Sequence, residues 1–168
     1  MKRCPTGFKY DNGKEECISN EIANFEIKRY LGVWHEQGST PLWFSRGCTN
    51  TTAKYSIEKD GNIKVENRCI VNGSQKKSTG KAYKTDEKGL LKVGFFPSKR
   101  PLFKADYKIS YIDEGYKTAI VTSGKSVWIL TRDKEITKHR YNVLIAKANR
   151  LEIDTRNIKR TENGWRKM

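Results

Sequence analysis

Between residues 32 and 132 the sequence repeats one pattern, in which short stretches of alternating apolar and polar residues are each ended by turn-forming residues. Alternation with a period of two places successive side chains on opposite faces of a β-strand. The connections include Asp60-Gly61, Asn72-Gly73 and Asp113-Glu114-Gly115, which are typical of tight turns between antiparallel strands. Because no helical pattern separates these stretches, we predict consecutive strands that pair antiparallel with their neighbours.

The predicted strands cover residues 32–38, 51–57, 62–70, 78–84, 90–96, 105–112, 117–122 and 127–132. Such a set can close on itself and remove both sheet edges. Thr137 then provides an N-cap for a helix over about residues 138–150, which carries an apolar stripe. The predicted fold class is therefore all-β: an eight-stranded antiparallel up-and-down β-barrel with one C-terminal α-helix packed outside it.

The length of 168 residues suits one domain with a core of its own. We expect an irregular N-terminal extension over residues 1–24, a barrel domain over residues 25–162 and a C-terminal tail over residues 163–168. Within the barrel domain, residues 154–161 resemble a short extra strand.

Four cysteines allow three pairings. Turn signals between Cys4 and Cys17 favour a disulfide that closes the extension. The register of the hairpin formed by residues 51–57 and 62–70 places Cys48 nearly opposite Cys69. An even cysteine count and Asn-x-Ser/Thr sequons at Asn50 and Asn72 favour an oxidising compartment. We therefore expect a secreted, periplasmic or otherwise extracytoplasmic protein, although the chain shows no signal peptide.

The chain is strongly basic, with 34 Lys and Arg against 19 Asp and Glu, a net charge of +15 and a pI near 9.7. Such a charge suits nucleic acid, anionic lipid or other polyanions. The cations are spread along the strands, however, which favours a solvated basic surface over a dedicated polyanion site. The strand aromatics alternate inward rather than outward, so we expect no nucleic-acid partner and keep an anionic membrane surface as a possible one.

Several classes of site are not expected. The chain has no Gly-x-Ser-x-Gly motif, no zincin motif and no Cys-x-x-Cys, and it contains two histidines. No apolar run approaches the ~20 residues of a membrane-spanning helix. We therefore expect neither an enzyme nor a bound metal or cofactor.

Two distant stretches point to the closure of one barrel end. Gly32-Val33-Trp34 opens the first strand, and Arg132 ends the last. A buried indole needs a partner for its N–H, and a guanidinium stacks well on an aromatic face. We expect Gly32, Trp34 and Arg132 to close this end.

These and other motifs resemble lipocalins of the bacterial Blc and apolipoprotein D type. The matching residues are Gly32-x-Trp34, Cys48-Thr49-Asn50, Ala53-x-Tyr55-Ser56-Ile57, Asn67-Arg68-Cys69, Gly80-Lys81-Ala82, Leu91-Lys92-Val93, Phe95-Phe96, Asp113-x-x-Tyr116, Ala119-Ile120-Val121 and Trp128-Ile129-Leu130-Thr131-Arg132. The resemblance covers roughly residues 25–160. It implies a barrel open at one end, the lipocalin calyx, that stores or carries a small hydrophobic ligand, with a fatty acid or lysophospholipid expected.

The resemblance also implies which residues contact the ligand. The expected set is Glu36, Trp43, Phe44, Tyr55, Ile57, Val65, Asn67, Leu91, Val93, Phe95, Tyr107, Ile109 and Val121. Trp43 and Phe44 are adjacent aromatics in the first loop and are expected to form a lid, whereas plain core packing is the alternative for the wall residues. The competing function is a basic β-barrel that binds a polyanion such as nucleic acid or a membrane surface. A monomer or a dimer fits either function.

Overall fold

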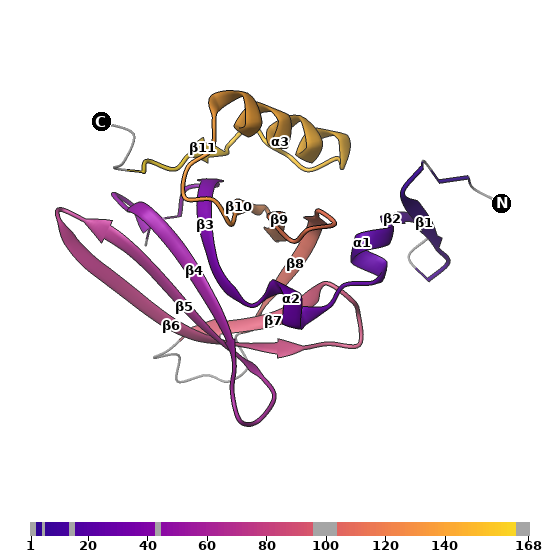
Figure 1. Cartoon of the computed structure of the whole chain (residues 1–168), viewed down its shortest axis with the longest axis horizontal. Helices are drawn as coiled ribbons and strands as arrows, with labels where there is room; N and C mark the ends of the chain where they lie inside the picture. The colour runs from indigo at the N-terminus through magenta and orange to yellow at the C-terminus, as the bar shows by residue number, and fades with distance from the viewer. Residues whose placement is uncertain (1–2, 5, 14–15, 43–44, 96–103, 164–168) are drawn as a thin grey trace.

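The structure is a computed structural model, and it describes residues 3–4, 6–13, 16–42, 45–95 and 104–163. Its main element is a closed barrel with a helix on its outer face and a small N-terminal extension at one side (Figure 1). The barrel strands are β3 (Gly32–Ser39), β4 (Thr49–Ile57), β5 (Ile63–Val71), β6 (Ser74–Lys84), β7 (Leu90–Phe95), β8 (Ala105–Ile112), β9 (Thr118–Ser123) and β10 (Ser126–Thr131).

Each barrel strand pairs antiparallel with the next, and β10 pairs with β3 to close the sheet. This confirms the predicted eight-stranded up-and-down barrel. The turns follow the sequence signals: Asn72 and Gly73 between β5 and β6 both have positive φ angles, of 49° and 77°. Glycine and asparagine adopt this left-handed conformation most readily, which favours the tight β5–β6 hairpin.

A single long helix, α3 (Lys138–Arg150), lies against the outside of the barrel (Figure 1). The Thr137 side chain accepts a hydrogen bond from the Arg140 backbone N–H, which confirms the predicted N-cap. The helix buries Leu144 and Ala148 against outward-facing barrel residues such as Ile120 and Ile129. This outer core is separate from the core inside the barrel.

Gly38 allows the helix to approach the barrel closely. A Cβ atom at this position would lie 2.8 Å from the Tyr141 hydroxyl of α3. A larger residue would therefore push α3 away from β3.

The N-terminal extension is more regular than the sequence predicted. Strands β1 (Phe8–Asp11) and β2 (Glu16–Ser19) form a hairpin, which is followed by the short helices α1 (Asn20–Ala23) and α2 (Ile27–Tyr30). The Cys4–Cys17 disulfide ties the chain before β1 to β2, with a Cα–Cα distance of 5.6 Å. The expectation of an irregular extension was wrong because the turn residues between the cysteines reverse the chain into paired strands.

The C-terminal segment completes the open end of the barrel. Strand β11 (Lys159–Arg160) pairs with Ser39 and Gly38 of β3. It lies on the same edge of β3 as β4, which pairs with β3 only nearer the closed end, at residues 32–35. Beyond β11, the Asn50 backbone N–H of β4 donates to the carbonyl of Glu162. Residues 159–163 therefore fill the gap between β3 and β4, and we call them the C-terminal wedge.

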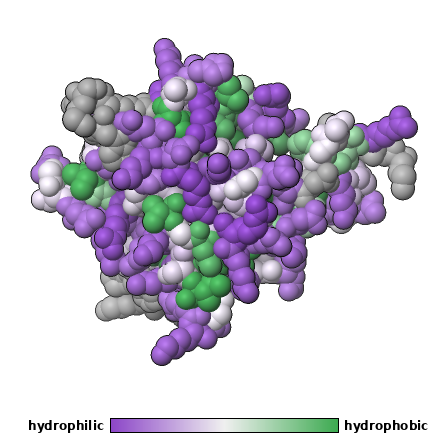
Figure 2. All heavy atoms as spheres, viewed as in Figure 1, coloured by the Kyte–Doolittle hydropathy of each residue, from purple (hydrophilic) through white to green (hydrophobic). Residues whose placement is uncertain are grey.

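The surface is mainly polar. The face shown in Figure 2 is dominated by hydrophilic residues, with small hydrophobic groups between them. Among the residues that the structure describes, no helix is both long and apolar enough to span a membrane.

Candidate functional site

Trp34 and Arg132 lie together at the closed end of the barrel. Trp34 is fully buried, and its indole Nε1 donates to the Tyr30 carbonyl at 2.8 Å. The guanidinium carbon of Arg132 lies 3.9 Å from the centroid of the Trp34 ring. The Arg132 nitrogens also donate to backbone carbonyls of the chain that crosses this end, including those of Leu31 and Val33, both at 2.9 Å. The Arg132 side chain, which follows β10, thus links the end of the last strand to β3 and to the segment that crosses the closed end, residues 29–31.

Gly32 is needed for this arrangement. Its φ angle is +98°, and a Cβ atom there would lie 3.3 Å from Arg132 Nη1. Any other residue would be strained in its backbone and would crowd the guanidinium.

Three tyrosines form a layer above this end. The Tyr107 hydroxyl is hydrogen-bonded to that of Tyr30 and lies 2.8 Å from that of Tyr55. Burial raises the pKa of Tyr55 to about 12 and raises the pKa values of Tyr30 and Tyr107 well above the ordinary value. The three phenols therefore stay neutral at physiological pH and form a polar floor inside an otherwise apolar barrel.

A cavity of about 670 Å³ lies above the tyrosine floor. Seven of the residues expected to contact a ligand line it: Glu36, Tyr55, Val65, Asn67, Val93, Phe95 and Tyr107. They come from β3, β4, β5, β7 and β8, because the inward positions of successive strands meet only after the sheet closes. The barrel is therefore hollow towards its open end.

Other expected contacts lie elsewhere. Ile57 is 43% exposed, because β3 begins at Gly32 opposite Tyr55 and leaves the end of β4 without a β3 neighbour. Leu91, Ile109 and Val121 are buried in the packed core inside the barrel and do not line the cavity. These four residues therefore do not line the cavity, unlike the seven expected contacts described above. Trp43 and Phe44 lie outside the described residues.

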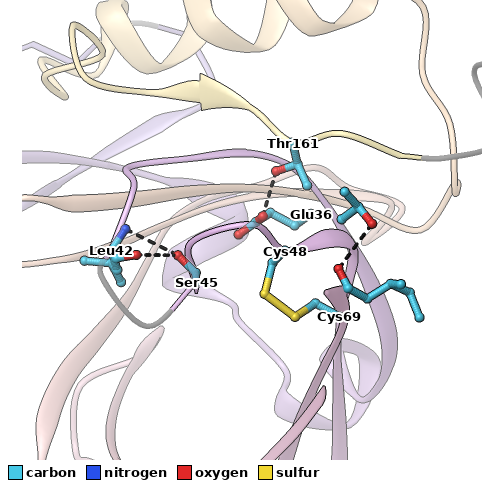
Figure 3. Close-up of a disulfide and its surroundings, with 8 residues drawn as sticks. Glu36, Leu42, Ser45, Cys48, Cys69 and Thr161 are labelled. Carbon is cyan, nitrogen blue, oxygen red and sulfur yellow. Dashed lines mark hydrogen bonds between the residues drawn. A yellow bond between two sulfur atoms is a disulfide. The ribbon is translucent and has the colours of Figure 1, made fainter. Parts of the chain in front are cut away.

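Glu36 lies where the cavity meets the C-terminal wedge. Its Oε2 accepts a hydrogen bond from the Thr161 hydroxyl at 2.6 Å, and Figure 3 shows this contact beside the Cys48–Cys69 disulfide. Burial raises the pKa of Glu36, although hydrogen bonds from Thr161 and Ser39 oppose the shift. The effect of burial is the larger one, so the pKa of this carboxyl group on the cavity wall lies above its ordinary value.

The Cys48–Cys69 disulfide lies in the cavity wall near the open end. It links the residue before β4 to the inward face of β5, with a Cα–Cα distance of 5.4 Å, and both cysteines line the cavity. Both disulfide pairings expected from the sequence are thus present.

Comparison with known proteins identifies the family. Residues 25–163 match the family model described as a lipocalin-like domain. The chain is a lipocalin. A putative lipocalin (R877) of Acanthamoeba polyphaga mimivirus is 32% identical over 151 residues, which cover 86% of this chain and 88% of that protein. The outer membrane lipoprotein Blc of Escherichia coli (strain K12) is 34% identical over 139 residues, covering 79% of this lipocalin and 76% of Blc.

Solved structures show the same fold. Lobster apocrustacyanin A1 aligns with a TM-score of 0.69 at 18% identity, covering 96% of this lipocalin and 94% of that chain. Insecticyanin from the tobacco hornworm Manduca sexta aligns with a TM-score of 0.66 at 18% identity, covering 82% and 80%. Lipocalins generally bind small hydrophobic ligands, which fits a hollow barrel with apolar walls.

The sequence analysis missed part of the lipocalin cavity wall. Leu42, Thr51, Ala53, Arg68, Lys76, Ser78, Ser123, Trp128 and Leu130 also line it. The alternation of Trp128, Ile129 and Leu130 on β10 would have indicated two of these. Lys76 was missed because β6 begins at Ser74, earlier than the predicted start at residue 78, whereas Ser78 is the first residue of the predicted strand. Among the described residues, no group of three His, Cys, Asp or Glu side chains is placed to hold a metal ion.

Proposed function

We propose that this lipocalin stores or carries a single-chain amphiphile, a fatty acid or a lysophospholipid, in the barrel cavity. The observation that carries the proposal is the cavity of about 670 Å³, whose walls are mainly apolar and whose open end is polar. Pockets for small molecules commonly measure about 300–1,000 Å³. A cavity of this size and shape suits one acyl chain.

Apolar burial supplies the affinity. Each methylene removed from water contributes about 0.8 kcal/mol, so ten methylenes contribute about 8 kcal/mol before entropic costs. Val65, Val93, Phe95, Trp128 and Leu130 provide the apolar wall for such a chain.

The open end provides partners for an anionic head group. Asn67 and Ser78 line the cavity there together with the cations Arg68 and Lys76. Burial raises the pKa of Glu36, which weakens the repulsion between this carboxyl and a negative head group. An acyl chain with a carboxylate or phosphate therefore fits with its tail inward and its head group at the opening.

The two disulfides support a location outside the reducing cytoplasm. We propose that the protein is secreted or otherwise extracytoplasmic and acts by carriage rather than by catalysis.

The test is displacement of a dansyl-labelled undecanoic acid from the purified protein by unlabelled fatty acids and lysophospholipids, with native mass spectrometry of co-purifying lipid. Ala53→Trp fills the cavity from β4, and Lys54→Trp places the same ring on the exposed outer face as a matched control. We expect Ala53→Trp to lower affinity at least tenfold and Lys54→Trp to leave it unchanged.

Salt separates this function from polyanion binding. Displacement by lipid should persist between about 50 and 200 mM salt, whereas nucleic-acid binding through several phosphate contacts would fall by about 10³-fold or more. Saturable binding of nucleic acid with no uptake of any acyl chain would contradict the proposal.

A further inference from the structure

The two ends of the barrel differ in charge. Three strand connections lie at the closed end, over residues 58–62, 85–89 and 113–117. They contain six carboxylates and three lysines: Glu58, Asp60, Asp86, Glu87, Asp113 and Glu114, with Lys59, Lys88 and Lys117. These three connections are therefore acidic on balance, although the whole chain carries a net charge of +15 and the segment that crosses this end contains Lys28 and Arg29.

The open end has the opposite character. One exposed cation lies in or beside each of its four strand connections, and we call these residues the open-end cations: Arg46, Lys76, Lys104 and Lys125. The described residues of these connections include neither Asp nor Glu. Arg46, Lys104 and Lys125 make no ion pair with any described residue, and Lys104 lies 3.7 Å from the centroid of the Tyr83 ring.

Nearby acidic groups do not neutralise this end. Asp106, two residues after Lys104, is ion-paired with Lys92 on the neighbouring strand. Glu36 is partly buried in the cavity wall and accepts a hydrogen bond from Thr161. Glu162 of the C-terminal wedge is exposed on this side, and Arg160 lies on the same segment. Lys125 shares an outer pocket with the exposed Glu152 and with Asp154, which is ion-paired with Arg156. The positive charge therefore surrounds the entrance to the cavity.

We propose that this lipocalin docks on anionic membranes with its open end towards the bilayer. Each Lys or Arg near an anionic lipid surface strengthens binding by about fivefold, so four cations together give an affinity that depends on anionic lipid. The carboxylates of the three closed-end connections are repelled by the same surface, which favours this orientation. A docked mouth would let an amphiphile pass between bilayer and cavity without crossing bulk water. The passage of an amphiphile between bilayer and cavity rests on the proposed lipid-carrying function, whereas the docking does not.

A membrane fits the open end better than a nucleic acid. Single-stranded nucleic acid is bound on exposed aromatic rings beside cations. Phe95 and Trp128, which are described aromatics near this end, line the cavity. A ring of cations around an apolar cavity instead matches a lipid head-group surface.

Two charge-reversal variants test the proposal. The mouth variant is Arg46→Glu/Lys104→Glu/Lys125→Glu, and the matched control is Lys59→Glu/Lys88→Glu/Lys117→Glu at the closed end. All six residues are exposed, and both variants change the net charge equally. Binding of the protein to vesicles is measured by flotation at about 0.1 M salt, where the Debye length is about 10 Å. The neutral vesicles contain phosphatidylcholine alone, and the anionic vesicles contain phosphatidylcholine and phosphatidylglycerol.

We expect the wild type to bind the anionic vesicles and not the neutral ones, and to be released by high salt. The partition coefficient of the mouth variant on anionic vesicles should fall about 100-fold, because three cations that each contribute about fivefold are removed. The partition coefficient of the control should fall far less. An equal loss in both variants would show binding through net charge alone and would overturn the proposal. So would stronger binding to single-stranded DNA than to anionic vesicles.

A second readout separates docking from carriage. Transfer of the dansyl-labelled fatty acid to vesicles should speed up with anionic lipid for the wild type and for the control, but not for the mouth variant. Fatty-acid affinity in solution should be the same in all three proteins. If the wild type binds no fatty acid yet still docks, the carrying function fails and the docking stands; if it binds fatty acid without docking, the reverse holds.

Discussion

The Arg132 guanidinium lies over the Trp34 indole, with 3.9 Å between its central carbon and the ring centroid, although 98 positions along the chain separate the two residues. The same guanidinium donates to the carbonyls of Arg29, Tyr30, Leu31, Val33 and Tyr116. It therefore closes the barrel through stacking and through backbone hydrogen bonds at once. This contact explains why a glycine and a tryptophan at positions 32 and 34 act together with an arginine at position 132.

Replacement of Arg132 should destabilise the barrel. We expect Arg132→Ala to lower the free energy of unfolding by about 2–4 kcal/mol, because it removes a cation–π contact and leaves partly buried carbonyls unpaired. Arg132→Lys should recover less than half, since one ammonium cannot reach carbonyls on several sides. Urea denaturation followed by tryptophan fluorescence measures both. Lys134→Ala, on the same loop and exposed, serves as the control and should change stability by less than about 0.5 kcal/mol.

Glu36 should make stability depend on pH. Burial raises the pKa of this carboxyl in the folded state, so the unfolded state loses its proton first as the pH rises. The stability linked to the protonated group is full below the unfolded pKa, near 4.5, and is lost as the pH rises through the folded value. We expect Glu36→Gln to match the wild type at about pH 4 and to be more stable at about pH 7.5. Urea denaturation at the two pH values tests this, and an equal difference at both would rule out a raised pKa.

The tyrosine floor should resist ionisation. Burial raises the pKa of Tyr55 to about 12, so between pH 10 and about 12 the unfolded state releases this proton and the folded state keeps it. Tyr55 alone should then remove about 1.4 kcal/mol of stability per pH unit over that range. Ultraviolet titration should show fewer phenolates near pH 11 in the native protein than in urea. Tyr107→Phe should leave the native signal at that pH unchanged, and a loss of one full phenolate would contradict the assignment.

The two disulfides should differ in their effect on the barrel. Cys48–Cys69 closes a loop within the barrel wall with a sequence separation of 21, so its replacement by serines should cost about 3 kcal/mol. Cys4–Cys17 lies in the extension outside the barrel, and its replacement should leave barrel unfolding nearly unchanged. Thermal denaturation of the two double variants measures the contrast. Equal losses would show that the extension folds as part of the barrel.

Local sequence patterns were sufficient for the barrel strands, the C-terminal helix and their order. Alternating residues and Asp-Gly or Asn-Gly turns predicted the barrel strands, and Thr137 predicted the start of α3. The hairpin register brought Cys48 and Cys69 together, because pairing of adjacent strands depends on nearby residues. The regular hairpin in the extension was not predicted, since four-residue strands carry too little alternation to distinguish them from loops.

The sequence by itself determined the strand order, the closing residues Trp34 and Arg132 and both disulfides, because these depend on period-two alternation, turn chemistry and a few specific side chains. The tertiary structure alone decided where the barrel is hollow. Leu91, Ile109 and Val121 share the inward face with Val65 and Val93, yet the first three pack solid while the other two line the cavity. Alternation reports which face a side chain occupies but not its height along the barrel axis. That height depends on strand register, on the three tyrosine rings and on the C-terminal wedge beside Glu36, all of which are brought together only when the chain closes on itself.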